Sequence, residues 1–221
     1  LNSWAIAGAG ILGAGSLLAL VTLVAWRVKD SMTLLIVGLM VGSAVAAVVA
    51  VLSFFSGAEA LKLYTVWSMG SLGALTWSQV SILGLLILVG VLPIAGSIKS
   101  YNALLMGETY ARSMGIHTTS LRWWMIGSAG ILAGGITAFC GPIAFLGIAV
   151  PHLARMAWKS ADHRVLFPGS AVLGASLVLL CDAFSHFPGW ASSLPINAVT
   201  SLIGAPLVIS LILKKNFSKD F

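Results

Sequence analysis

Ionisable side chains are rare in this sequence, and one pair of them lies inside an apolar segment. Asp182 is the only acid well inside such a segment, and His186 follows it by four residues, about one helical turn. A carboxylate and an imidazole at this spacing can share a hydrogen bond, and ionisable groups within a membrane commonly mark a ligand site or a proton relay. The spacing therefore predicts an Asp182–His186 pair that either is structural or faces a ligand or a proton.

A second pair of opposite charges lies in residues 99–122, the only extended polar stretch between two apolar blocks. Glu108 and Arg112 stand four residues apart with the acid first, the favourable order for an ion pair on one helix face. The stretch predicts a short helix over residues 103–114, closed by Gly115 because glycine tolerates the left-handed conformation of a helix end. It is either a solvated helix joining two membrane spans or a docking surface for a soluble partner.

Several other chemistries have no motif in the sequence. A P-loop, a zinc-binding HExxH motif and a nucleophile elbow are all missing. We therefore expect no cofactor, metal or catalytic site in this chain, and any energy source must come from another subunit. An intramembrane hydrolase would need a nucleophile and a base paired on facing spans. Cys140 and Cys181 lie in apolar blocks and are expected to be small buried apolar groups, whereas His152 and His163 are expected to pack or hydrogen-bond locally.

The composition indicates a membrane protein. Of the 221 residues, 59% are hydrophobic and only 8% are charged, whereas a soluble surface typically needs about 25–35% charged residues. The net charge of +6 comes from short clusters at the ends of apolar blocks, so it indicates membrane orientation and not a nucleic-acid surface. The sequence predicts an all-α bundle that crosses the membrane several times.

Seven segments are apolar enough to cross a bilayer, for which about 17–25 residues are needed. They are residues 4–26, 32–55, 77–98, 123–140, 142–158, 167–184 and 198–213. Gly141 and Pro142 divide the charge-free stretch 123–153, because proline is accepted in a first helical turn and poorly in a helix interior. Pro151 predicts a kink or an early end just before His152.

Basic residues fall almost entirely on one side of these seven spans. Every lysine and arginine except Lys62 is on that side, and such residues favour the cytoplasmic face. The distribution predicts Leu1 outside, Phe221 inside and residues 99–122 in the cytoplasm. The long outer connection predicts a short surface helix at residues 58–67. Three tryptophans are expected in the aromatic belt at the lipid boundary: Trp67, Trp77 and Trp190.

Small residues at four-residue spacing allow helices to approach closely in lipid. Gly38 and Gly42 form one such face, and Gly130 with Gly134 forms another. Gly204 is expected to act similarly in the last span. Together these positions predict a dense bundle, in which the second span is a candidate for a subunit contact or for the lining of a pathway.

Four segments resemble the successive motifs of the FecCD permeases, the membrane subunits of ABC importers for iron-siderophores, haem and vitamin B12. They are residues 105–115 (LMGETYARSMG), 141–155 (GPIAFLGIAVPHLAR), 162–168 (DHRVLFP) and 194–206 (LPINAVTSLIGAP). The resemblance extends over essentially the whole chain. Since members of that family have ten spans, it implies that this chain holds the last seven and that three others precede it.

The resemblance implies both a fold and a function. The fold would be the helical bundle of vitamin B12 importer permeases, with residues 1–221 forming one incomplete permease domain in a bacterial inner membrane. The function would be inward transport of a chelate by alternating access. Implied partners are two cytoplasmic ATPases that bind ATP and Mg²⁺, a second permease copy or paralogue, and an extracytoplasmic binding protein. The rival interpretation is a secondary, proton-coupled transporter that uses Asp182 and His186.

The resemblance also implies roles for particular residues. The helix that seats in the ATPase would include Gly107, Glu108, Ala111, Arg112 and Gly115. The second span would follow the central pathway, with Ser31 and Met32 near its cytoplasmic constriction and Gly38 and Gly42 further along it.

Docking of the binding protein would involve Lys62 and His186 on the outer side. At the position of His186 many family members carry an arginine that meets acidic residues of the binding protein. Ser193 and Asn197 stand where a glutamate and a glycine are usual. All three departures concern the outer docking role.

Overall fold

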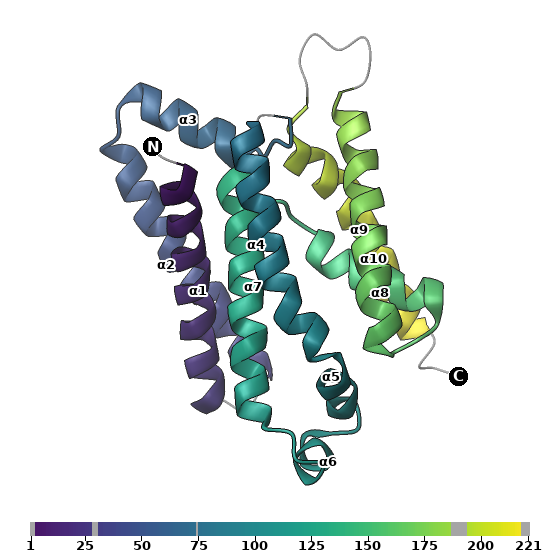
Figure 1. Cartoon of the computed structure of the whole chain (residues 1–221). Helices are drawn as coiled ribbons and strands as arrows, with labels where there is room; N and C mark the ends of the chain where they lie inside the picture. Colours follow the sequence, from purple (N-terminus) through teal and green to yellow (C-terminus); the bar gives the residue numbers. More distant parts are fainter. Residues whose placement is uncertain (1–2, 28–30, 74, 187–193, 218–221) are drawn as a thin grey trace. The chain divides into compact units, whose positions relative to one another are not determined.

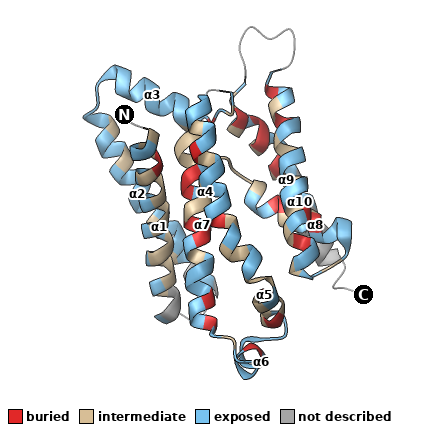
Figure 2. Ribbon diagram, viewed as in Figure 1, coloured by how far each residue is buried: buried red, intermediate tan, exposed pale blue. Residues whose placement is uncertain are grey.

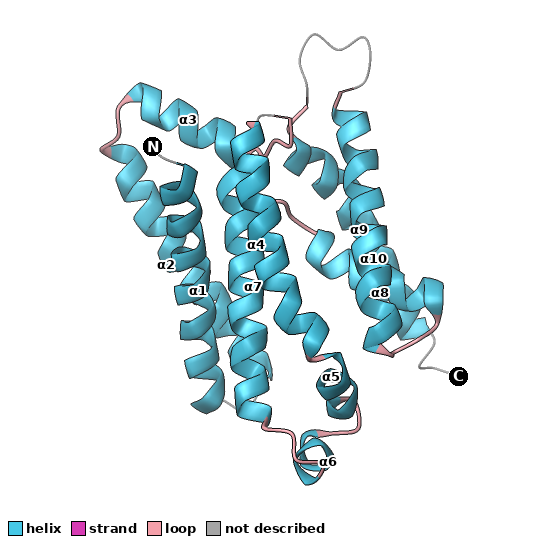
Figure 3. Cartoon of the chain, in the orientation of Figure 1, coloured by secondary structure: helices cyan, strands magenta, loops and turns pink. Residues whose placement is uncertain are grey.

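Helices form the regular structure of the described part of the chain, residues 3–27, 31–73, 75–186 and 194–217 of this computed structural model (Figures 1 and 3). The predicted all-α class is therefore confirmed. The helices are α1 (Ser3–Arg27), α2 (Ser31–Phe54), α3 (Ala58–Ser68), α4 (Trp77–Gly96), α5 (Ile98–Leu104), α6 (Glu108–Ser113), α7 (Thr118–Cys140), α8 (Leu146–Trp158), α9 (His163–Ser185) and α10 (Ile196–Phe217).

Two compact units make up the chain. Unit 1 comprises Leu1–Ser68, Thr76–Pro93 and Arg122–Phe139. Unit 2 comprises Met69–Leu75, Ile94–Leu121 and Cys140–Phe221. The predicted cytoplasmic segment therefore belongs to the same unit as α8, α9 and α10.

Among the residues that the structure describes, five helices are long and apolar enough to cross a membrane. They are Ser3–Val24, Leu35–Phe54, Trp77–Gly96, Thr118–Cys140 and His163–Ser185, and they confirm five of the seven predicted spans. The seventh predicted span lies within α10, whose 22 residues correspond to about 33 Å. The predicted surface helix is also present, as α3. Trp190, which was expected at the lipid boundary, lies outside the described residues.

The fifth predicted span differs from the expectation. Pro142 does not begin a helix, since residues 141–145 are non-helical and α8 starts only at Leu146. With 13 residues, α8 is about 20 Å long and cannot cross a hydrocarbon layer of about 30 Å alone. Five residues add at most about 17 Å, so a membrane crossing at this place would need the irregular segment as well as the short helix. Pro151 lies inside α8 and does not end it, which corrects the expectation of an early stop.

Backbone groups of the irregular segment find partners in unit 2. The side-chain oxygen of Asn197 accepts a hydrogen bond from the Ala144 backbone N–H at 3.2 Å. Just before the segment, the carbonyl of Cys140, the last residue of α7, accepts one from the Ser71 backbone N–H at 3.0 Å. Polar backbone within a membrane needs such partners because lipid offers none. The position at which this chain departs from the usual glycine, Asn197, thus supports the non-helical segment.

Glycines bring α1 and α7 into close contact within unit 1. A Cβ atom on Gly134 would lie 2.6 Å from the Gly10 carbonyl oxygen and 2.7 Å from the Cα of Ile11, and one on Gly130 would lie 3.4 Å from the Cα of Gly15. The predicted packing role of Gly130 and Gly134 is therefore confirmed.

The glycines of α2 have no such neighbours. A Cβ on Gly38 or Gly42 would meet nothing within 4 Å, and α2 is exposed along most of its length (Figure 2). The role of this helix in a pathway or subunit contact stays a prediction.

In unit 2, α8, α9 and α10 contact one another, and Cys181 of α9 forms a buried cluster with Ile196 and Val199 of α10. Both cysteines are buried and free, as expected. A Cβ on Gly204 would lie 2.6 Å from that of Phe145, which confirms that Gly204 permits close approach.

Candidate coupling site

The expected single helix over residues 103–114 is wrong, because the segment forms two helices. α5 ends at Leu104 and α6 begins at Glu108. Between them the backbone N–H groups of Leu105, Met106 and Gly107 each donate to the carbonyl three residues earlier, which tightens the end of α5. Gly107 then takes φ +107°, a conformation that only glycine adopts at low cost. Sequence periodicity does not reveal this turn, since the glycine is compatible with either arrangement.

The end of α6 confirms the role predicted for Gly115. Its φ is +82°, its N–H donates to the Arg112 carbonyl at 2.9 Å, and the Ile116 N–H donates to the Ala111 carbonyl at 3.1 Å. These two bonds define a Schellman motif, in which glycine in the left-handed region closes the helix. Ala111 is fully buried and anchors α6 from inside.

Replacing Gly115 by Ala is expected to lower the free energy of unfolding by about 1–2 kcal/mol, because an L side chain at this positive φ is strained. Thermal melting of the purified protein in detergent would measure the loss. A variant with Ala at Gly84, which has no positive φ and no atom within 4 Å of its Cβ position, serves as the control. An unchanged melting temperature for the Gly115 variant would contradict the expectation.

The Glu108–Arg112 pair is confirmed, and it includes a third residue. Arg112 Nη2 lies 2.8 Å from Glu108 Oε1, Arg112 Nε donates to Thr118 Oγ1 at 3.2 Å, and that hydroxyl donates to Glu108 Oε1 at 3.0 Å. Thr118 is the first residue of α7 and is buried. This α6–α7 triad, Glu108, Arg112 and Thr118, therefore fixes α6 against the start of the next helix. The sequence gives no signal for Thr118, because its distance from Glu108 and Arg112 along the chain matches no helical period.

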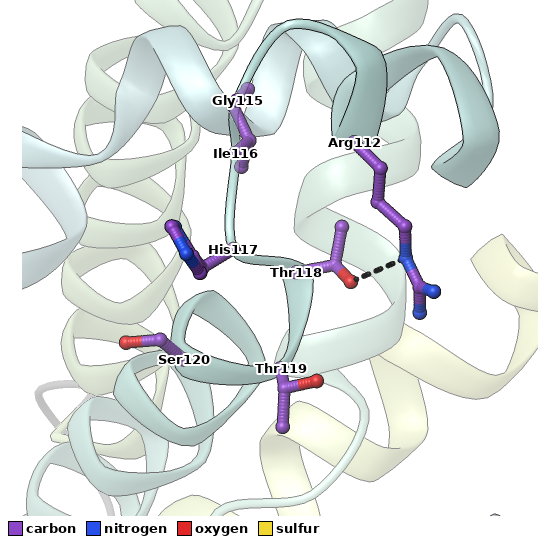
Figure 4. Close-up of a pocket in the computed structure, with 7 residues that line it drawn as sticks. All are labelled: Arg112, Gly115, Ile116, His117, Thr118, Thr119 and Ser120. Carbon is purple, nitrogen blue, oxygen red and sulfur yellow. Dashed lines mark hydrogen bonds between the residues drawn. The ribbon is translucent and has the colours of Figure 1, made fainter.

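A hollow of about 540 Å³ adjoins the triad and is lined by Arg112 and residues 115–120 (Figure 4). In Figure 4 the Arg112–Thr118 hydrogen bond lies on one side of the lining residues, and His117 and Ser120 lie on the other. Its walls come from the end of α6 and the start of α7, so the two helices shape it together.

Large apolar side chains are exposed around α6. The exposed fractions are 53% for Leu105, 68% for Met106, 46% for Tyr110 and 60% for Met114. Exposed apolar groups on a lipid-facing helix are ordinary, whereas a group of them in a polar loop segment indicates an interaction surface. We call these four residues the α6 apolar surface.

Polar residues also tie α5 to the start of α9. The Asn102 amide donates to Asp162 Oδ1 at 2.6 Å, and Asn102 Oδ1 accepts from the His163 backbone N–H at 2.8 Å. His163 was expected to hydrogen-bond within its own turn, but its Nδ1 lies 2.8 Å from Asn102 Oδ1, which belongs to α5 and is 61 residues away. We call Asn102, Asp162 and His163 the α5–α9 clamp. The role of Asn102 could not be predicted from the sequence, because asparagines are common in polar segments such as residues 99–122.

Asp162 caps α9 by accepting the Arg164 backbone N–H at 2.8 Å. This bond, followed by the Asn102 amide, holds the pKa of the Asp162 carboxyl below its ordinary value. A depressed carboxyl pKa means that the stabilising contribution is present at neutral pH and is lost as the pH falls through the folded-state pKa.

Asp182 and His186 are neighbours, as predicted. His186 Nδ1 lies 3.0 Å from the Asp182 backbone carbonyl and 3.5 Å from its carboxylate oxygen. The shorter contact is to the backbone, so the imidazole chiefly hydrogen-bonds a carbonyl in the last turn of α9.

The remaining predicted site residues lie on separate elements. Met32 is 70% exposed near the start of α2, where Ser31 is the first residue. Lys62 is exposed on α3 in unit 1, whereas His186 follows α9 in unit 2. Their assignments to a pathway and to outer docking stay predictions.

A sequence model of the FecCD transport family matches residues 1–214. This chain belongs to the FecCD transport family. The vitamin B12 import system permease protein BtuC of Shigella sonnei is 34% identical to it over 214 residues, which is 97% of this chain and 65% of the relative. The hemin transport system permease protein HmuU of Yersinia pestis is 34% identical over 194 residues, 88% of this chain and 58% of the relative.

A solved structure, described as an inward-facing metal-chelate type ABC transporter, has the same fold. It aligns with 89% of this FecCD chain and 64% of its own length, with a TM-score of 0.77 and 30% identity. The chain thus spans about two thirds or less of the proteins it matches. The family and the apolar helices together identify a multi-pass membrane protein of the permease fold.

Proposed function

We propose that this FecCD-family chain is part of the permease subunit of an ABC importer, which carries a metal chelate, haem or cobalamin-type molecule into the cytoplasm. The similar proteins named above are described as permeases for vitamin B12 and hemin and as a metal-chelate ABC transporter. The permease binds no nucleotide itself. ATP and Mg²⁺ are bound by a separate cytoplasmic ATPase, and transport proceeds by alternating access.

The segment from α5 to the start of α7 carries this proposal. Gly107 and Gly115 delimit a helix of only six residues, and the α6–α7 triad fixes its orientation. The α6 apolar surface is exposed in the segment that charge distribution assigns to the cytoplasm. A short, rigidly held helix with exposed apolar groups can bind a soluble partner and be displaced when that partner changes conformation.

The rest of the chain would complete the transporter around this site. Ser31, Met32, Gly38 and Gly42 would follow the pathway together with the second permease copy or paralogue. Lys62 and His186 would meet the extracytoplasmic binding protein. The protein would lie in the bacterial inner membrane with residue 1 outside and residue 221 in the cytoplasm.

The test is co-purification of the permease with the ATPase encoded beside it. Met114→Asp is expected to weaken ATPase binding by about tenfold or more, because truncating or charging a central apolar contact of an interface commonly costs over 1–2 kcal/mol. The matched control is Leu63→Asp. Leu63 is 73% exposed on α3, on the opposite side of the membrane in the proposed topology.

ATPase binding that survives Met114→Asp but fails with Leu63→Asp would contradict the proposed topology. Uptake that persists without any ATP-hydrolysing companion would overturn the importer and favour a carrier. The match to ABC-type permeases favours the importer.

A further inference from the structure

The N-terminus of α9 is completed by a residue from a different helix. The first N–H groups of a helix lack partners within it. In α9 the first of them, from His163, donates to Asn102 Oδ1 of α5, while that of Arg164 donates to the capping residue Asp162. Because the amide of the same Asn102 also donates to Asp162, one side chain holds both the helix end and its cap.

The clamp lies directly beside the candidate coupling helix. Asn102 is five residues before Gly107, where the chain turns into α6. The ring of Tyr101, the preceding residue, is buried with its centroid 5.9 Å from that of His163. A displacement of α6 therefore reaches Asn102 through a tight turn and not through a long flexible linker.

The other side of the clamp continues into the helices of unit 2. A Cβ on Gly169 of α9 would lie 3.1 Å from the ring of Trp158, so the end of α8 packs closely on the start of α9. Cys181, further along α9, packs against Ile196 and Val199 of α10. Because the contacts between these helices are close-packed, a displacement of α9 is expected to move α8 and α10 with it.

We propose that the α5–α9 clamp is the mechanical link of the transporter, through which displacement of α6 moves α9 and the helices packed on it. This inference rests on the proposed function. Asn102 is a positioning residue: it touches neither substrate nor ATPase in this assignment, but it makes α5 and α9 move together. Breaking it is expected to separate ATP hydrolysis from transport while the ATPase remains bound.

The experiment exchanges the two hydrogen-bonding side chains of the clamp in the full permease, reconstituted with its ATPase and binding protein in liposomes. Asn102→Asp has nearly the same shape but brings a carboxylate against Asp162 and removes the amide donor. Asp162→Asn keeps an oxygen that can cap α9, since asparagine and aspartate cap helices about equally well. The double variant restores one amide and one carboxylate in reversed positions. ATP hydrolysis, substrate uptake and bound ATPase are measured for each.

We expect Asn102→Asp to reduce the substrate carried per ATP hydrolysed by at least about fivefold, a typical lower bound for coupling between sites. The amount of folded permease and of bound ATPase should not change. The double variant should recover most of the wild-type ratio of substrate carried to ATP hydrolysed. A general loss of stability would not give such a recovery, because a double-mutant cycle isolates the direct interaction between the two side chains.

Two results would overturn the clamp. One is a wild-type ratio in Asn102→Asp. The other is a loss of uptake that only parallels the loss of folded protein or bound ATPase. Either result leaves the proposed function intact if the wild-type permease performs ATP-dependent uptake. Failure of the wild-type permease to bind an ATPase would instead overturn the proposed function itself.

Discussion

Replacing Glu108 by Arg is expected to uncouple the proposed importer, lowering transport-coupled ATP hydrolysis by about tenfold or more, within the usual range of coupling between sites. The substitution removes the acceptor for both Arg112 and Thr118 and places two cations one turn apart on α6. An exposed ion pair on a helix is worth only about 0.3–0.5 kcal/mol, so overall stability should hardly change. The loss would therefore come from the misdirected α6 and not from unfolding.

The measurement is ATP hydrolysis stimulated by the loaded binding protein in proteoliposomes, together with binding of that protein from outside. Outer binding should remain intact because α6 lies in the segment assigned to the cytoplasm. Glu108→Gln is the matched control, since its amide oxygen can still accept from Arg112 and Thr118. Normal coupled hydrolysis in the Arg variant would count against the role of the α6–α7 triad.

Replacing Gly134 by Ala is expected to lower the free energy of unfolding by about 1–3 kcal/mol, the usual cost of overpacking. The new methyl group would lie 2.6 Å from the Gly10 carbonyl oxygen and 2.7 Å from the Cα of Ile11. Both atoms belong to the backbone of α1, so no side chain can turn aside and the two helices must separate. Unfolding in a detergent titration, followed by circular dichroism, would measure the change.

Gly127 provides a control on the same helix, seven residues earlier. A Cβ there would meet no atom within 4 Å, so Gly127→Ala should be neutral or raise stability by up to about 1 kcal/mol through its helix propensity. If Gly134→Ala lowers the free energy of unfolding and Gly127→Ala leaves it unchanged or raises it, the close approach of α1 and α7 is the cause of the loss. Equal changes in the free energy of unfolding for the two variants would contradict that explanation.

Local patterns predicted those features that depend on neighbouring residues. The spacing of Glu108 and Arg112 predicted their ion pair, and glycine at position 115 predicted the end of α6. Long apolar runs predicted five spans, and the glycine pair in α7 predicted a close helix contact. Each of these inferences needs only a helical period or the conformational freedom of one residue.

Inferences failed where two conformations were locally similar in energy. Pro142 was compatible with a first helical turn, yet the chain stays irregular to Phe145, where the Asn197 side chain accepts the Ala144 backbone N–H and Ser71 donates to the last carbonyl of α7. The helix expected over residues 103–114 divides at Gly107 because its backbone takes a positive φ. Neither choice can be read from the adjacent residues.

By itself the sequence determined that the chain is a membrane protein, where five long apolar helices lie, and which polar stretch separates two of them, since these depend on composition and period. Only the tertiary structure decided that Thr118 joins Glu108 and Arg112, and that Asn102 completes the first turn of α9. Those partners are separated by 10 and 61 residues. Hydrogen bonds over such distances depend on how helices pack, and a linear pattern carries no information about that packing.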